Sequence, residues 1–232
     1  RNKRRTKRLI LRARTASLGT MLYNTPHFRQ TDRERLIEAL DEARFATLVS
    51  NSPDGPVISH LPLLLDRTLG PNGTLIGHVA RANPHWTMAL RDVPSVAIVH
   101  GPDAYVSPGW YPSKAETGKA VPTWNYTVIH ATGRLGVHED TAWLRDAVSR
   151  LTDRHERGRA EAWSLADAPE SYIAAQLKGI VGISLEITSL EGKVKLSQNR
   201  SAADRDGVVT GLSGEPDPSS AAIRRLMNPS VG

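Results

Sequence analysis

The 232-residue chain has no cysteine, is only 5% aromatic and contains no long apolar run. Without cysteine it can form no disulfide, thiolate metal site or cysteine nucleophile. No apolar stretch is long enough to span a bilayer, and the first twenty residues lack the apolar core of a signal peptide. The eight histidines show neither an HExxH motif nor close metal-ligand spacing, so we assign no metal site. We therefore expect a cytoplasmic protein without a membrane partner.

Positive charge is concentrated at the start of the chain. Lys and Arg number 30 against 24 Asp and Glu, and eight of the 30 lie in residues 1–20, where there is no acid. The remaining chain has 22 against 24, a balance of −2. We expect residues 1–20 to be a basic, disordered arm that can contact phosphates nonspecifically. Residues 212–232, rich in Gly, Ser and Pro, are expected to be a flexible tail with a short terminal helix over 221–227.

The stretch Thr74–Trp86 (TLIGHVARANPHW) combines a predicted strand with the start of a helix. Asn83 is a good N-cap and Pro84 suits the first helical position, which predicts a helix over 84–91. Free N–H groups and the dipole at such a helix start favour an anion, and Arg81 stands beside them. The alternative is that Arg81 pairs with a carboxylate and the Asn-Pro pair merely caps the helix.

Apolar periodicity and turn residues predict the remaining elements. The predicted strands are 45–50, 57–65, 74–80, 95–100, 104–108, 124–137 (bent at Gly133) and 180–188. The predicted helices are 31–43, 140–155 and 169–178, and residues 109–122 are expected to form a long loop. Strands at regular spacing with inserted helices favour a mainly β (α+β) fold, a closed antiparallel barrel with helical flanks, over a doubly wound parallel sheet.

Few side chains stand out as chemical candidates. Ser59 and His60 are adjacent on a strand and point to opposite faces, so they cannot act as a nucleophile and its base. His78 and His85 are better explained as a barrel-wall histidine and an exposed helix histidine than as a pair. Four aromatic residues gather around the long loop, where they predict the wall of a pocket for a flat ring or a subunit interface. They are Trp110, Tyr111, Trp124 and Tyr126.

Five longer motifs make the chain recognisable. They are SHLP (59–62), GHVARANPHW (77–86), AYVSPxWYPSK (104–114), VPTWNY (121–126) and KLSQNR (195–200). Together they resemble the PaiB-like family of FMN-binding negative transcriptional regulators, from about Tyr23 to Gly211. The resemblance implies a flavin-binding split β-barrel, similar to pyridoxamine-phosphate oxidases, with helical insertions over residues 21–211. It also implies a homodimer with FMN at the subunit interface.

By this resemblance, three sets of residues form the FMN site. Arg81, Asn83 and His85 would hold the phosphate, and Ser59 and His60 would lie near the isoalloxazine or ribityl part. Four residues from the long loop and the next strand, Trp110, Lys114, Trp124 and Asn125, would close the site across the dimer. Lys195, Gln198 and Arg200 match the family's late motif and are expected in the site or the interface. The alternative for KLSQNR is a strand end that locks the barrel through satisfied polar contacts. No catalytic residue is assigned.

Three functions follow as hypotheses. The first is a flavin-linked sensor that acts as a negative transcriptional regulator. Direct DNA binding is possible, but no helix-turn-helix pattern supports it, and the balance of −2 beyond residue 20 gives no basic footprint. The second is an FMN-dependent oxidoreductase, in which the cofactor supplies the redox chemistry. The third is a haem-binding split barrel with a histidine as axial ligand.

Overall fold

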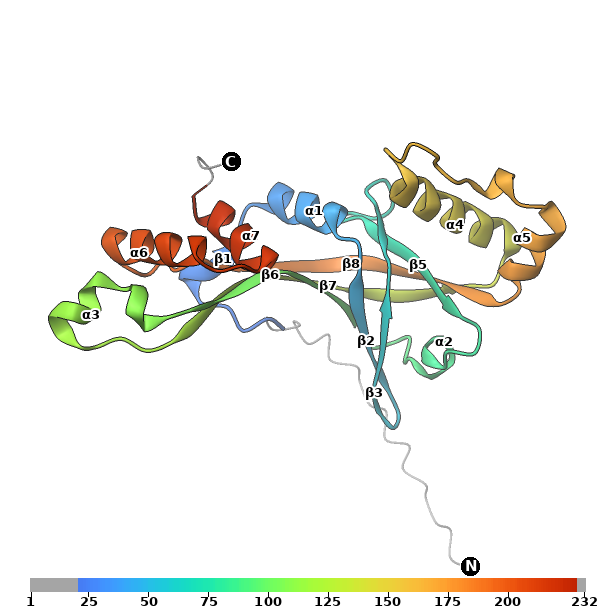
Figure 1. Cartoon of the computed structure of the whole chain (residues 1–232). Coiled ribbons are helices and arrows are strands. Elements are labelled where there is room, and N and C mark those ends of the chain that lie inside the picture. Colours follow the sequence, from blue (N-terminus) through green and yellow to red (C-terminus); the bar gives the residue numbers. More distant parts are fainter. Residues whose placement is uncertain (1–20, 229–232) are drawn as a thin grey trace, which may run out of the picture.

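The computed structural model describes residues 21–228, so the basic arm predicted at 1–20 lies outside it. Its strands form one eight-stranded sheet in which every pairing is antiparallel (Figure 1). The strand order is β3-β2-β6-β7-β8-β5-β4, with β1 paired to β8. The strands are β1 Arg29–Gln30, β2 Ala46–Ser52, β3 Gly55–Leu61, β4 Leu64–Asp66, β5 Thr74–Ala80, β6 Ser95–Val106, β7 Thr123–His138 and β8 Ile180–Lys195. The predicted antiparallel, mainly β fold is confirmed.

The barrel is split rather than closed by a continuous ladder. The predicted strand 57–65 is two strands, β3 and β4, which stand at opposite ends of the sheet order. Pro62, between them, has no N–H to donate to a ladder. The chain passes instead close to β5 at Gly77, where an added Cβ would lie 2.8 Å from the carbonyl oxygen of Pro62. Close packing at this glycine therefore replaces hydrogen bonds where a closed barrel would have them.

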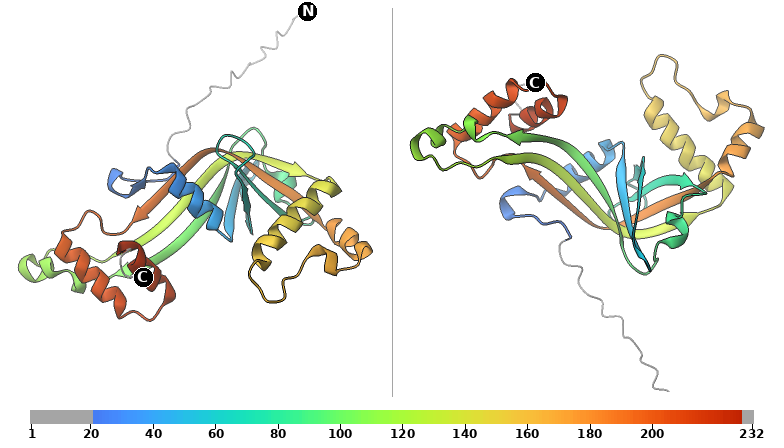
Figure 2. Two further views of the ribbon diagram at one scale, coloured as in Figure 1. Left: turned by 90° about the horizontal axis from the view of Figure 1, so that it is seen from above. Right: turned by 60° about the horizontal axis from the view of Figure 1, so that its bottom comes forward.

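Helices cover the sheet in separate places (Figures 1 and 2). The α-helices are α1 Arg33–Glu42, α2 His85–Met88, α3 Pro112–Thr117, α4 Thr141–Glu156, α5 Glu170–Leu177, α6 Ala202–Ser213 and α7 Pro218–Met227. The 3-10 helices are η1 Pro26–Phe28, η2 Pro108–Trp110 and η3 Leu165–Asp167. Within residues 21–228, no helix combines the length and apolar character needed to cross a membrane.

Helix α1 closes the main core. Asp32 accepts hydrogen bonds from the backbone N–H groups of Glu34 and Arg35, which fixes the helix start. The apolar stripe of Leu36, Ile37 and Leu40 then packs into the curved sheet, against a cluster that includes strands β2, β5, β7 and β8. The predicted helix over 31–43 is confirmed, and so are those over 140–155 and 169–178, which are α4 and α5.

Strands β6, β7 and β8 continue past the barrel as a three-stranded sheet extension, defined here as residues 103–106, 123–127 and 193–195. The strands predicted at 95–100 and 104–108 are one strand, β6, with a register shift between His100 and Asp103. Strand β8 runs seven residues beyond the predicted end, to Lys195. Strand β7 shifts register between Thr132 and Gly133, where the sequence predicts a bend.

Helices α6 and α7 cover one face of the sheet extension, and α3 lies beside α6 at its tip (Figure 1). The core under α6 and α7 includes Val106, Val208, Leu212 and Ile223, all nearly inaccessible to solvent. The prediction of a flexible tail from residue 212 is therefore wrong for residues 212–228, because the apolar side of α7 packs into this core. The terminal helix predicted at 221–227 lies within α7, and the expected domain end at residue 211 falls inside α6.

Candidate functional site

The predicted phosphate-binding residues Asn83 and His85 form a buried hydrogen-bond network with Ser59. His85 is 0% exposed, and its Nδ1 lies 2.9 Å from the Ser59 hydroxyl while its Nε2 lies 2.8 Å from that of Ser50. Asn83 donates to Ser59 at 2.9 Å and accepts from the backbone N–H of His85. Ser50 in turn contacts Ser95 at 2.6 Å. The network ties α2 to β2, β3 and β6, so its polar atoms are used within the fold.

Burial favours the neutral form of the His85 imidazole. Loss of solvation, and then the nearby charge of Arg91, lower the pKa of His85 from its ordinary value. A neutral ring donates from one nitrogen and accepts at the other, and hydroxyl groups on both sides can rotate to satisfy either tautomer. The expectation of an exposed helix histidine is wrong, because the ring points into the barrel wall rather than away from it.

Arg81 is engaged by other parts of the chain. Its Nε donates to the carbonyl of Lys178 at 2.9 Å, and its terminal nitrogens contact the Glu139 carboxylate at 2.6 Å and the carbonyl of Ile180 at 3.2 Å. Helix α2 has only four residues, so it offers little of the helix-start field that the sequence predicts. Both observations match the alternative interpretation, in which Arg81 pairs with a carboxylate and the Asn-Pro pair caps a short helix.

Ser59 and His60 point to opposite faces of β3, as predicted. Ser59 is buried, whereas His60 is exposed and its Nδ1 lies 3.1 Å from the Thr47 hydroxyl on β2. His60 is therefore the predicted site residue near β3 that a molecule outside the barrel can reach.

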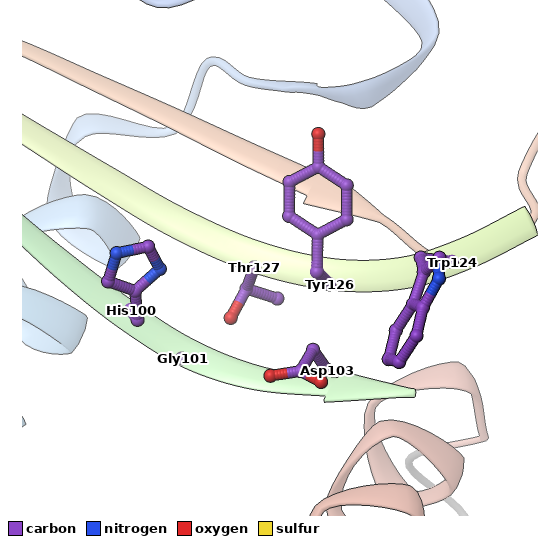
Figure 3. A pocket seen from close by; sticks show the side chains of 6 residues that line it. All are labelled: His100, Gly101, Asp103, Trp124, Tyr126 and Thr127. Atoms are coloured by element: carbon purple, nitrogen blue, oxygen red, sulfur yellow. The ribbon is translucent and has the colours of Figure 1, made fainter. Parts of the chain in front are cut away.

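The second set of predicted residues lies on the sheet extension, which projects away from α2 and β3 (Figure 1). Trp124 is 52% exposed and meets Tyr105 edge-on, with ring centroids 6.0 Å apart. Beside it lies a cavity of about 410 Å³, whose lining side chains on β6 and β7 are drawn in Figure 3. Its lining residues are His100, Gly101, Asp103, Trp124, Tyr126 and Thr127. The hollow coincides with the register shift in β6, since Pro102 cannot donate to the ladder.

Two lysines on β8 share the face of Trp124 and Tyr126. Tyr126 is the cross-strand partner of Lys195, and Lys193 lies two residues away on the same face. Lys193 is only 6% exposed, donates to the carbonyl of Tyr23 at 3.1 Å and lies 5.1 and 5.2 Å from the ring centroids of Tyr23 and Tyr126. This is a preorganised cationic position.

The Lys195 ammonium donates to the Thr123 hydroxyl. Burial, then the charges of Lys193 and Arg200, lower the pKa of Lys195. Neither Lys193 nor Lys195 forms an ion pair with a carboxylate among residues 21–228. Two partly desolvated cations without a counter-charge form a suitable setting for an anion.

Comparison with known proteins identifies the family. The family model described as "Putative FMN-binding domain" matches residues 22–189. The chain belongs to this FMN-binding domain family. It is 29% identical to "Protease synthase and sporulation protein PAI 2" of Bacillus subtilis over 208 residues, which cover 89% of this chain and 96% of the relative. It is 33% identical to an uncharacterized protein of Aspergillus fumigatus, AFUA_5G13800, over 72% of this chain and 80% of the relative.

Solved structures agree on the fold. The flavocytochrome Anf3 from Azotobacter vinelandii matches with a TM-score of 0.55 and 17% identity, covering 72% of this chain and 69% of its own. An FAD and haem binding protein from Mycobacterium smegmatis matches with a TM-score of 0.53 and 21% identity, covering 81% and 80%. The PaiB-like resemblance and the split-barrel fold are thus confirmed, and FMN is the cofactor of the family.

The chemistry of the sheet extension fits FMN. A flavin has an anionic phosphate and a flat, largely apolar ring, and this face offers Lys193 and Lys195 for the first and Trp124 and Tyr126 for the second. The opposite face of these strands packs against α6 and α7, so it is closed to a ligand. These four residues form a donor set whose chemistry matches both parts of FMN.

The other predicted residues of this region have structural partners. Asn125 is 0% exposed, exchanges hydrogen bonds with Ser197 and lies 3.5 Å from the Met227 sulfur. Gln198 accepts from the N–H of Leu196 and donates to the carbonyl of Val194, the strand-end lock that was the alternative for KLSQNR.

Three more predicted residues lie around α3 and α6. Arg200 lies over the Tyr111 ring at 4.8 Å, and Trp110 packs on Gly211 of α6. Lys114 is exposed on α3. The structure thus brings none of these three into the lining of the cavity beside Trp124.

Sequence reasoning missed Lys193, His100 and Asp103. The predicted strand ended at residue 188. The alternation of side chains along a strand, which places Lys193 and Lys195 on one face, was therefore not applied to them. His100 and Asp103 are cavity neighbours only because β6 continues through Gly101 and Pro102. A prediction that extended both strands to their full length would have identified all three residues.

Proposed function

We propose that the protein binds FMN at the exposed face of the sheet extension and that a second copy of the chain completes the site. The observation that carries this proposal is the aromatic wall of Trp124 and Tyr126 beside the unneutralised Lys193 and Lys195. In this site the two lysines bind the phosphate, while the aromatic side chains orient the ring and exclude water from one side of it. Bound FMN supplies redox chemistry that the chain itself lacks.

The need for a second copy follows from where the predicted residues lie. Those around α2 and β3 lie on the barrel, whereas those on the sheet extension lie on strands that project away from it (Figure 1). Exposed aromatic surface on the extension, with Tyr105 46% and Trp124 52% exposed, is typical of a subunit interface. In a homodimer, the exposed His60 of a second copy is the residue we expect opposite the aromatic wall.

The cofactor proposal is tested by visible absorption. The purified protein is mixed with FMN, desalted and scanned, and its mass is measured by sedimentation. We expect a retained flavin spectrum at the mass of a dimer. A chain that stays monomeric yet retains stoichiometric flavin would contradict the shared site, and one that retains no flavin would contradict the FMN site itself.

For the biological role, we propose a flavin-linked sensor that represses transcription. The support is the similarity to the Bacillus subtilis protein whose name associates it with protease synthesis and sporulation. Helices α6 and α7 are separated by a short turn of helix-turn-helix length, but Ser219 at the start of α7 exchanges hydrogen bonds with the backbone of Asp103 and Ile223 is 0% exposed. Because α7 packs on its own sheet, we propose indirect rather than direct repression.

Direct DNA binding is tested by titrating a labelled duplex at physiological salt, with and without FMN. The full chain should bind weakly and without sequence preference, and removal of residues 1–20 should abolish this salt-sensitive binding. If the shortened chain still binds a preferred DNA sequence, repression is direct and the proposal of indirect repression is wrong.

An FMN-dependent oxidoreductase is the second candidate, favoured by one observation. The cavity is open to solvent beside the aromatic wall, and His100 and Asp103 on its rim could orient a polar substrate (Figure 3). Anaerobic addition of NADH or NADPH should bleach the bound flavin if this reading holds. A flavin that stays oxidised removes the pyridine-nucleotide reductase.

Haem binding is the third candidate, since two solved structures with this fold are a flavocytochrome and an FAD and haem binding protein by name. His100 is the exposed cavity histidine available as a ligand. Haem titration of wild type and His100→Ala should give the same weak spectrum if the site is a flavin site. A sharp Soret band lost in His100→Ala would reverse the order of candidates.

A further inference from the structure

A cavity lined mainly by arginines lies where the C-terminal ends of α1 and α4 meet. The cavity has a volume of about 500 Å³, and an adjoining hollow of about 530 Å³ shares part of its wall. The lining residues are Glu42, Arg44, Arg154, His155, Arg157 and Arg159. Four arginines against one carboxylate give this lining an excess of positive charge.

Part of this charge has a structural role. Arg154 contacts the Asp41 carboxylate at 3.3 Å and donates to the carbonyl of Ala43 at 3.2 Å, so it caps the end of α1. Arg159 pairs with Glu156 at 3.4 Å. Compensation of the α4 dipole accounts for Arg154 in its last turn, but not for Arg44 or Arg159, which lie outside the helix.

Arg44 and Arg157 are the members left over. Neither forms an ion pair with any carboxylate in the part of the chain that the structure describes. Arg44 sits between α1 and β2, and Arg157 is the C-cap of α4, followed by Gly158 with φ of 85°. Two separate elements therefore present guanidinium groups to one cavity, and each can bind an oxyanion through two parallel hydrogen bonds.

We propose that this cavity binds a small ligand carrying a diphosphate or a comparable pair of anionic groups. Its volume lies in the range of small-molecule sites, which run from about 300 to 1,000 Å³. Its lining is charged rather than apolar, so the ligand is recognised by its oxyanions. A concave site of this size suits a compact phosphorylated metabolite better than a nucleic acid backbone, which binds along an extended basic surface. Because the ligand would contact the ends of both α1 and α4, binding should strengthen the attachment of α4 to the barrel.

The proposal is tested on the full chain with FMN added, by calorimetric titration with inorganic pyrophosphate at physiological salt. The Arg44→Gln/Arg157→Gln variant should bind pyrophosphate at least about tenfold more weakly, since each residue supplies a charge-assisted contact. Arg145→Gln is the matched control, because Arg145 lies on the same helix but pairs with Glu170 outside the cavity. Its affinity should change less than about twofold, as expected for an exposed charge.

Three results would overturn the proposal. They are the absence of saturable pyrophosphate binding by wild type, an equal loss in the Arg145→Gln control, and tight duplex DNA binding through Arg44 and Arg157 in place of pyrophosphate binding. If the double variant does not fold, amide chemical shifts of the wild type decide. Pyrophosphate should then perturb residues 42–44 and 154–159, and shifts confined to other residues would contradict the site.

Discussion

At the scale of single residues, Arg81 shows what a sequence window can and cannot predict. A helix starts beside it as predicted, but one residue late and only over His85–Met88, with Pro84 as the N-cap in place of Asn83. The partners of its guanidinium, however, lie 58, 97 and 99 residues further along the chain. Local chemistry identifies an arginine that must bind something anionic or polar, and only the tertiary structure assigns Glu139 to it.

Replacing Arg81 should therefore affect stability more than cofactor binding. Arg81→Gln loses a part-exposed ion pair and two hydrogen bonds to carbonyl groups, so we expect about 1 kcal/mol less stability in urea unfolding. FMN affinity should stay within about threefold of wild type. Glu139→Gln serves as the matched variant, and the two effects should not add, because the residues share one contact. A large loss of FMN affinity with unchanged stability would return Arg81 to the phosphate site.

His85 should make stability depend on pH. Its pKa in the folded chain is lowered from 6.5, first by burial, so between the two values the unfolded chain binds more protons. Its contribution to stability is therefore complete above 6.5 and is lost as the pH falls below that value. Burial also lowers the pKa of His78, His130 and His138, so wild type should show a combined decline.

The His85→Gln variant separates the contributions. It leaves buried serine hydroxyl groups poorly satisfied and should cost about 1 to 3 kcal/mol at about pH 8. At about pH 5.5 the gap to wild type should narrow, because the variant has no imidazole at this position to protonate. Urea unfolding at the two pH values measures both quantities. If the stability difference between the variant and wild type is equal at the two pH values, the protonation of His85 is not coupled to folding.

Lys195 is the residue whose loss should weaken FMN most directly. Its ammonium has no carboxylate partner among residues 21–228, so an anion gains a charge-assisted hydrogen bond there. Lys195→Gln should reduce FMN affinity by about tenfold or more, measured by flavin fluorescence quenching. Lys178→Gln, at the C-cap of α5 just before β8, removes the same charge and should leave the affinity unchanged. Equal losses in both variants would indicate a general field rather than a site.

At the scale of elements, the sequence predicted which segments are strands better than where they end. The strands that stop at turn residues, such as β2 and β5, lie within two residues of their predicted limits. Strand β6 was predicted as two strands and β8 as a shorter one, because Gly101, Pro102 and polar residues after Thr188 are typical of loops. Cross-strand pairing with β7 overrides these local preferences, and both lysines of the candidate site lie in the omitted part of β8.

The glycines of α6 allow close packing. Gly207 and Gly211 each face Trp110, and an added Cβ at Gly207 would overlap the Trp110 carbonyl oxygen. The absence of side chains lets α6 approach η2 closely, which is a packing requirement that composition alone cannot distinguish from flexibility.

Substitution at Gly207 should therefore loosen the helices that cover the sheet extension. Gly207→Ala must push α6 away from backbone atoms, so we expect a loss of about 1 to 3 kcal/mol despite the better helix propensity of alanine. Gly214→Ala is the control, since its nearest neighbour would lie at an ordinary 3.5 Å. Urea unfolding compares the two. If Gly207→Ala is as stable as wild type, α6 does not need the close approach.

At the scale of the whole molecule, the predicted site residues do not form one site within one chain. Side chains of Ser59, Asn83 and His85 hydrogen-bond to one another within the barrel wall. His60, by contrast, is exposed on the outside of β3. The Trp124 and Lys195 face lies beyond the barrel on long strands that project past it (Figure 2). The sequence motifs name residues of a shared site but do not say which copy of the chain supplies each one. The separation of the two sets within one chain lets variants of each set test this.

Mixed dimers of two variants test the shared site. Suppose that His60 of one copy lies opposite Lys195 of the other. In His60→Ala and Lys195→Gln homodimers both sites are then damaged, and we expect the FMN affinity of each homodimer to fall at least about tenfold. A dimer with one chain of each kind would instead hold one intact site and one doubly damaged site. Differently tagged chains, co-expressed and purified through both tags, should thus bind one FMN per dimer with wild-type affinity. If both sites of the mixed dimer bind FMN weakly, His60 and Lys195 belong to a site formed by one copy. If the His60→Ala homodimer binds FMN with wild-type affinity, β3 is not part of the site, because the sheet extension then binds FMN without His60.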